Sequence, residues 1–300
     1  MKRIKKDKKF LKNRGFSFIE LALVLAVIGA LIGGIIGGQK AVELAALNGA
    51  RSATITSPVS VIDGLVLWLD TTSKKSFDET ETKNSTKITN WYDINPKKND
   101  SINFTQTTTA DKPTYTVKAI GRLPALVFSS NVMHSVNTVN IDRLLSPTGE
   151  VTVFAVGKNS LTGGLNASFF WYWNGGTDRV GFAFANASPS IYWNSGVCCA
   201  GVVNTSFSSY TGQWVILSGI RKSDTTELRI NGIQKSIATT PIVGISHSTA
   251  VQAIVGTGDN AGSKLGGGMA EVIVFNRGLG SSEVASIEAY LSQKWKIKLQ

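Results

Sequence analysis

The hydrophobic positions of this chain form one long run near its start. Residues 16–36 read FSFIELALVLAVIGALIGGII, and only Ser17 and Glu20 interrupt the apolar side chains. A helix needs about 20 such residues to cross the hydrocarbon core of a bilayer, so this run predicts a transmembrane helix. Glycines crowd its second half, and several lie four residues apart, a spacing that lets helices approach closely in a membrane.

Polar positions become more frequent after this run. Residues 39–50 (QKAVELAALNGA) are amphipathic, and Asn48-Gly49 predicts the end of the helix. Residues 51–62 contain Ser, Thr and Pro without helical periodicity, which is typical of a linker. We therefore expect a stem helix over 16–50 and a linker over 51–62.

Short β-rich runs alternate with Gly, Asn, Asp and Pro throughout residues 63–300. Asn231-Gly232 predicts a type I′ hairpin turn, because both residues accept positive φ. Many short strands at this spacing predict a mainly β domain, an antiparallel β-sandwich or jelly roll. The strands that we expect cover 65–69, 125–128, 151–156, 168–173, 180–184, 214–220, 227–230 and 270–275.

A helical period returns near the C-terminus, where Ser281 or Ser282 is a predicted N-cap. We expect a short helix that packs on the sandwich through one apolar stripe. The stripe consists of Val284, Ile287, Leu291 and Trp295.

The charge of the chain is concentrated at its start. The formal net charge is +11, and residues 1–15 hold eight of the 31 basic residues but one of the 20 acidic residues. Basic residues before a transmembrane helix are retained in the cytoplasm, so residues 1–15 are interpreted as a leader that places the later residues outside. The rest of the chain gives no electrostatic case for binding nucleic acid.

Glu20 is unusual in an apolar helix, where a charged side chain costs roughly 2.5–3.5 kcal/mol at the bilayer centre. A cut after Gly15 would create an amino terminus at Phe16. In a bundle of such helices, the ammonium group of one chain could then neutralise Glu20 of another. A signal anchor without processing is the alternative.

The sequence RGFSFIEL before a long apolar run resembles the N-terminal signal of type IV prepilins and pseudopilins. Their pattern is a basic leader, a glycine before the cut, a phenylalanine first and a glutamate fifth, which Gly15, Phe16 and Glu20 match. The resemblance implies cleavage by a prepilin peptidase, N-methylation of Phe16 and storage in the inner membrane with the C-terminal domain extracytoplasmic. It also implies assembly with other pilin-like subunits through Phe16 and Glu20, in a pilus or at the cell surface.

The size of the domain after the linker favours a minor or adhesive pilin subunit over the main filament repeat. A type II secretion pseudopilin is the alternative. The domain over 63–300 resembles LamG-like jelly rolls of the concanavalin A type, which implies a head for adhesion or recognition of a glycan or a surface protein. The segments that carry this resemblance are GLVLWLD (64–70), WYD (91–93), GRLPALVF (121–128), VTVFAVGK (151–158), ELRINGIQ (227–234) and the long final segment 266–295.

Enzymatic activity is not expected. Retaining glycoside hydrolysis needs two carboxylates about 5–5.5 Å apart, whereas Glu227 and Glu271 each stand alone in their strands. His134 and His247 lack the spacing of metal ligands, and no cofactor is expected apart from calcium. The candidate calcium ligands, for which turn capping is the alternative, are Asp63, Asp70 and Asp93.

Aromatic side chains are the candidates for ligand binding, because exposed aromatic faces bind sugar rings and partner proteins. Packing in the core is the alternative. The adjacent Cys198 and Cys199 are candidates for a vicinal disulfide, with free thiols or intermolecular crosslinks as alternatives. The aromatic candidates are Trp171, Trp173, Tyr192 and Trp193.

Overall fold

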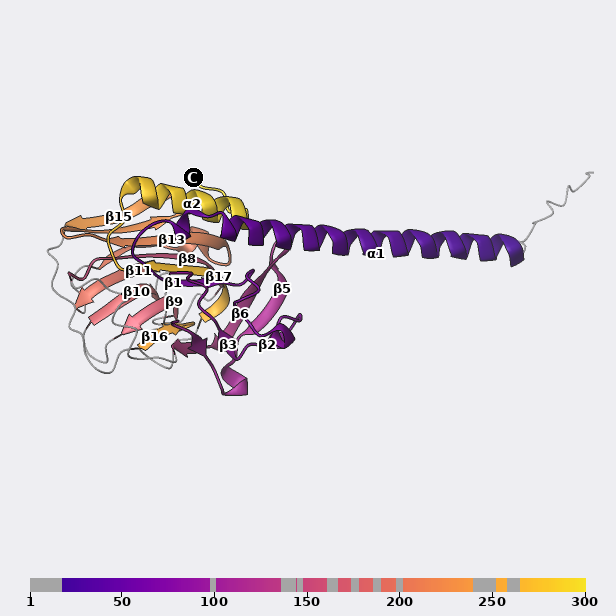
Figure 1. The fold of residues 1–300 in the computed structure, drawn as a ribbon, viewed down its shortest axis with the longest axis horizontal. Coiled ribbons are helices and arrows are strands. Elements are labelled where there is room, and N and C mark those ends of the chain that lie inside the picture. The colour runs from indigo at the N-terminus through magenta and orange to yellow at the C-terminus, as the bar shows by residue number, and fades with distance from the viewer. Residues whose placement is uncertain are drawn as a thin grey trace, which may run out of the picture. The chain divides into compact units, whose positions relative to one another are not determined.

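The computed structural model describes residues 18–97, 101–135, 144, 148–160, 167–173, 178–185, 190–197, 202–239, 252–257 and 265–300. Its internal contacts divide the chain into two units, Met1–Ala45 and Ala46–Gln300. The described part of the first unit is helical. The second unit holds the end of the same helix, two β-sheets and a C-terminal helix (Figure 1).

The N-terminal helix α1 covers Phe18–Ile55. It continues through Asn48-Gly49, so residues 51–55 of the predicted linker are helical. Ala50 and Thr54 are buried against the β domain, and this packing outweighs the weak helix propensity of the Asn-Gly pair. A short 3₁₀ turn, Pro58–Ser60, follows the helix.

Two antiparallel sheets form the β domain, which confirms the predicted mainly β, antiparallel sandwich. Each run expected as a strand lies within one of the observed strands. In spatial order, sheet A consists of β15 (Ile233–Thr239), β14 (Thr225–Ile230), β13 (Trp214–Arg221), β8 (Val151–Asn159), β17 (Leu265–Phe275), β6 (Leu123–Asn131), β5 (Thr114–Ile120) and β2 (Thr86–Lys87), with β1 (Leu65–Asp70) also paired to β17. Sheet B consists of β12 (Val203–Ser206), β11 (Ser190–Val197), β10 (Asp178–Ala185), β9 (Ala167–Trp173), β16 (Gln252–Val255), β7 (Met133–Ser135), β4 (Phe104–Thr105) and β3 (Asn90–Trp91).

The main core lies between the two sheets and is rich in aromatic side chains. Glycines on sheet A make room for large rings on sheet B. A Cβ atom at Gly157 would lie 2.7 Å from the Phe169 ring, and one at Gly219 would lie 2.4 Å from the Trp193 indole. Interior packing is tight at these points, as in the close-packed cores of other proteins.

The C-terminal helix α2 covers Ser281–Trp295 and lies across the outer face of sheet A (Figure 1). The predicted apolar stripe is confirmed, because all four of its side chains are buried. The N-cap is Gly280 rather than Ser281 or Ser282. The Gly280 N–H donates to Glu283 Oε2 at 2.8 Å, so a carboxylate in the first turn replaces the expected hydroxyl cap.

The hairpin between β14 and β15 has the predicted turn, with φ of 50° at Asn231 and 83° at Gly232. We expect Gly232→Ala to lower the free energy of unfolding by about 1–2 kcal/mol, because an L side chain is strained in this conformation. The matched control is Gly49→Ala, on the helical surface with no atom near its Cβ position, which should stabilise slightly. Urea unfolding of both variants tests this, and equal effects would contradict it.

Candidate functional site

The first candidate region is the apolar surface of α1. Its large side chains are exposed from Phe18 to Ile35, with Phe18 86% and Leu31 62% exposed. Among the described residues, α1 is the one helix that is long and apolar enough to span a membrane. A signal sequence shares these properties, so the helix is consistent with a membrane anchor or a signal. Glu20 is exposed on this surface, whereas Gly15 and Phe16 lie outside the described residues.

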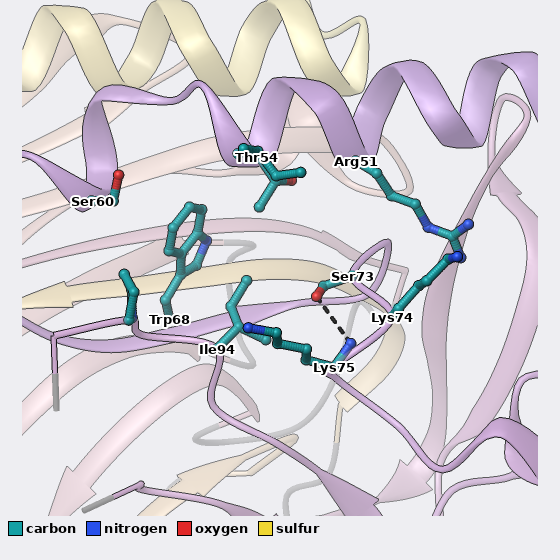
Figure 2. A pocket seen from close by; sticks show the side chains of 10 residues that line it. Arg51, Thr54, Ser60, Trp68, Ser73, Lys74, Lys75 and Ile94 are labelled. Atoms are coloured by element: carbon teal, nitrogen blue, oxygen red, sulfur yellow. Dashed lines mark hydrogen bonds between the residues drawn. The ribbon is translucent and has the colours of Figure 1, made fainter. Parts of the chain in front are cut away.

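The second candidate region is a cavity of about 610 Å³ between the end of α1 and the start of the β domain. Arg51, Thr54 and Ser60 line it from the helical side, while Trp68 and Ile94 line it from the opposite side (Figure 2). The Trp68 ring is buried and forms an apolar floor. No motif in the sequence indicated this cavity, because its lining comes from separate segments.

The cavity has a positive rim. Arg51, Lys74 and Lys75 line it, and no carboxylate is among the described residues that do so. Arg51 is fixed by a hydrogen bond from Nε to the Thr72 carbonyl oxygen at 2.9 Å. A cavity with an apolar floor and a cationic rim is suited to an anionic ligand.

Two buried carboxylates, Asp70 and Glu271, lie on neighbouring strands beneath α2. They are direct register partners in the β1–β17 pair and are 0% and 1% exposed. Nζ of Lys294, on α2, lies 2.9 Å from Asp70 Oδ2 and 2.8 Å from Glu271 Oε2. Burial raises the pKa of Glu271, with Lys294 opposing the rise and Asp70 adding to it.

The Glu271 carboxylate accepts hydrogen bonds on both oxygens. Oε1 accepts from Trp68 Nε1 and from the Tyr290 hydroxyl, each at 2.7 Å. Oε2 accepts from Trp295 Nε1 at 2.7 Å, in addition to Lys294. The aromatic donors therefore fix the carboxylate in position and separate it from solvent.

The Asp70 carboxylate is held equally firmly. Oδ1 accepts from the backbone N–H and the hydroxyl of Thr72, each at 2.8 Å. Oδ2 accepts from the Thr54 hydroxyl at 2.8 Å. Because Thr54 belongs to α1, this cluster connects the end of α1, strand β1, strand β17 and helix α2. We refer to Asp70, Glu271 and Lys294 as the ionic cluster.

The candidate calcium ligands do not come together. Asp70 belongs to the ionic cluster, and Asp93 Oδ1 accepts from the backbone N–H groups of Trp68 and Asn95, each at 3.0 Å. Asp63 is exposed and forms an ion pair with Lys97 at 3.5 Å. In the part of the chain that the structure describes, no three His, Cys, Asp or Glu side chains gather around a common point.

The structure places two of the aromatic candidates, Trp171 and Trp193, in the core, which was the alternative to ligand binding. Trp171 is 1% exposed, in a small cluster with Val132 and Ile254, and Trp193 is fully buried between the sheets. Neither ring presents a free face to a ligand in this conformation. Trp173 is half-buried and remains a candidate. Tyr192 lies on β11, its side chain is outside the described residues, and it also remains a candidate.

Cys198 and Cys199 lie outside the described residues, as does His247. The vicinal disulfide therefore stays a prediction.

His134 is on β7, where burial lowers its pKa below the ordinary value. The loss of hydration outweighs the opposing influence of Gln252 and Asp111, and the lowered pKa favours the neutral imidazole.

No protein-family model and no curated protein matches this sequence. Solved structures with a similar fold include a Trypanosoma rangeli sialidase, at 11% identity and a TM-score of 0.49, covering 77% of this chain and 33% of that one. The binding domain of botulinum neurotoxin serotype D/C VPI 5993 matches at 10% identity and 0.46, covering 76% and 52%. NanB sialidase from Streptococcus pneumoniae matches at 18% identity and 0.42, covering 53% and 26%.

The chain spans between about a quarter and a half of the lengths of these structures. Likenesses this distant establish neither a ligand nor an activity. What the fold itself defines is a class: a mainly β protein, with an antiparallel β-sandwich that follows a long apolar N-terminal helix and ends in a short helix.

Proposed function

We propose that this chain is a type IV pilin-like subunit, minor or adhesive, that displays a concanavalin A-type head outside the cell without enzymatic activity. The observation that carries the proposal is the uncovered apolar surface of α1, a helix that continues without a break into the β domain. An apolar surface of this length requires lipid or other helices to cover it. A pilin stem meets both, first in the inner membrane and then in the filament.

The small residues of α1 support close packing of neighbouring stems. Gly29, Gly33 and Gly37 are spaced by four, and no other atom lies within 4 Å of their Cβ positions. Neighbouring helices can approach closely along such a face. Glu20 then supplies the register, because an amino terminus at Phe16 of one chain neutralises the carboxylate of its neighbour.

Glu20→Ala tests the proposal. We expect the variant to be processed normally but to fall at least tenfold in filament content, because the neighbour's ammonium loses its partner. Immunoblots of sheared filaments and of membranes measure both quantities. Glu43→Ala, on the same helix and with the same loss of charge, is the matched control and should assemble.

Processing is tested separately with Gly15→Leu. This variant should keep the mass of the precursor, because the bulky side chain blocks the peptidase. A mature mass for Gly15→Leu would contradict the leader assignment. Normal filament content for Glu20→Ala would contradict the pairing of Glu20 with the neighbouring amine. An unprocessed protein that never enters filaments would favour a membrane-anchored lectin-like protein.

The positive rim of the cavity favours a second candidate function, recognition of an acidic glycan. We expect Lys74→Glu with Lys75→Glu to weaken binding to carboxylated or sulfated glycans by at least tenfold, with the largest loss at low salt. A glycan array with acidic and neutral members measures this. Lys83→Glu with Lys118→Glu changes the net charge equally at exposed positions outside the cavity and should leave binding unchanged. Equal losses in both variants, or binding of neutral glycans alone, would reject the cavity as the site.

A further inference from the structure

The geometry of the ionic cluster points to a covalent bond. We propose that the ε-amine of Lys294 condenses with the side-chain carboxyl of Asp70, with loss of water, to form an isopeptide that links α2 to β1. The reaction requires an amine, an acyl group and a proton carrier within contact distance in a site closed to water. Lys294, Asp70 and Glu271 supply these three groups.

The amine and the carboxyl group are already in contact. Lys294 Nζ is 2.9 Å from Asp70 Oδ2, and neither side chain has exposed surface. Groups held at such a distance react as if at very high local concentration.

The hydrogen bonds of Asp70 distinguish its two oxygens. The Thr72 backbone N–H donates to Oδ1 at 2.8 Å, and the Thr72 hydroxyl lies 2.8 Å from Oδ1 and 3.0 Å from Oδ2. These donors can stabilise the negative charge that develops on Oδ1 when the amine attacks. Oδ2, which faces Lys294 and receives the Thr54 hydroxyl, is the oxygen positioned to leave. Asp70 is assigned as the acyl group because Glu271, whose pKa is raised by burial, is the better proton carrier.

Glu271 is suited to carry the proton. Its Oε2 is 2.8 Å from Lys294 Nζ, and burial raises its pKa above the ordinary value. The indoles of Trp68 and Trp295 hold the carboxylate in place without competing as proton acceptors, since an indole N–H only donates. A fixed carboxyl of raised pKa is the usual form of a general acid–base group in a dry site.

The step balances without a further reactant. Glu271 takes a proton from the Lys294 ammonium, and the neutral amine attacks the Asp70 carboxyl carbon, so that a C–N bond forms. The nitrogen loses a second proton, the C–Oδ2 bond breaks, and Oδ2 leaves as water with the two protons. The ammonium and carboxylate become an amide and one water molecule, and Glu271 returns to its starting state.

The bond would join the first strand of the sandwich to its last helix. Strand β1 is the first strand after α1 in the sequence, so a pull on α1 would reach β1 before the other strands. A covalent link at Asp70 would prevent β1 from peeling away from β17 under such a load. The proposal does not depend on the pilin assignment, because the chemistry lies entirely within the domain.

Mass spectrometry of the full chain, purified in detergent, tests the proposal. We expect an intact mass lower than that of the sequence by one water molecule, after any N-terminal processing has been identified. A tryptic digest should contain a branched peptide that joins the segment with Asp70 to the segment with Lys294, with no cleavage after Lys294. A full mass with two separate linear peptides would overturn the proposal and leave a plain ion pair.

Three variants separate the formation of the isopeptide bond from the folding of the domain. Asp70→Asn should give a product with the same mass as the wild-type product, because the amide then leaves as ammonia. Asp70→Ala should show no branched peptide. Glu271→Gln preserves the shape of the site but removes the proton carrier, so most of the chain should stay unlinked while circular dichroism reports a folded domain. Full linkage in Glu271→Gln would overturn the role of Glu271.

Discussion

We expect Lys294→Met to lower the free energy of unfolding by about 3–5 kcal/mol, because it leaves two buried carboxylates without a cation. Asp70 and Glu271 are both essentially inaccessible to water, and Lys294 is the cation in contact with them both. This loss of stability is expected whether Lys294 of the wild-type protein is an ammonium ion or part of an amide. In both cases the Lys294→Met variant contains two free buried carboxyl groups. Urea unfolding of the full chain in detergent measures the change.

The matched control is Lys298→Met, an exposed position on the same terminal segment, which should change stability by less than about 0.5 kcal/mol. Asp70→Asn combined with Glu271→Gln in the Lys294→Met background should recover part of the loss, because neutral amides do not require a cation. If the free energy of unfolding stayed equally low after both carboxylates were removed, lost packing rather than unpaired charge would be the cause.

The pH dependence of Lys294→Met follows from the direction of the pKa shift. Burial raises the pKa of Glu271, and without Lys294 the opposing influence is gone, so the folded state binds protons more readily than the unfolded state. Stability of the variant should therefore rise as the pH falls from 7 towards the ordinary range of a glutamate, near 4.3. A free energy of unfolding of the variant that falls as the pH is lowered from 7 would contradict this prediction.

The ionic cluster shows why the fold was easier to predict than the site. The strands 65–69 and 270–275 are apolar runs, and their burial follows from local pattern alone. The pairing of these strands is a long-range property, so the contact between Asp70 and Glu271 could not be read from either segment. The signal that could have directed attention to them is a lone acid within each strongly apolar strand, since a buried charge requires a partner.

Lys294 illustrates the same limit on the C-terminal helix. The apolar stripe of this helix was predictable from its period, but the sequence suggests a solvated cation among the neighbouring Lys296 and Lys298. Only the docking of α2 on sheet A brings its ammonium to the carboxylates. Earlier in the sequence, the extension of α1 past Asn48-Gly49 has a comparable cause. Contacts of Ala50 and Thr54 with the β domain stabilise turns of helix whose local sequence predicts a stop.

We expect Trp193→Ala to lower the free energy of unfolding by about 3–5 kcal/mol, because it removes a large, fully buried side chain from the core. The Trp193 indole lies against Gly219 on the opposite sheet and beside Phe182, with ring centroids 5.0 Å apart. Trp173→Ala, at a half-buried position, should cost no more than about half as much. Thermal or urea unfolding compares the two, and a binding assay with the same variants separates a loss of ligand from a loss of fold.

A double-mutant cycle tests the contact between Trp193 and Gly219. Gly219→Leu alone should destabilise strongly, since a Cβ atom there would lie 2.4 Å from the indole. Combined with Trp193→Ala, the leucine can enter the space that the indole leaves, so the double variant should be more stable than the sum of the single effects predicts. Additive losses would mean that the two residues do not share this space. Recovery would establish that Trp193 stabilises the domain by packing in the space next to Gly219.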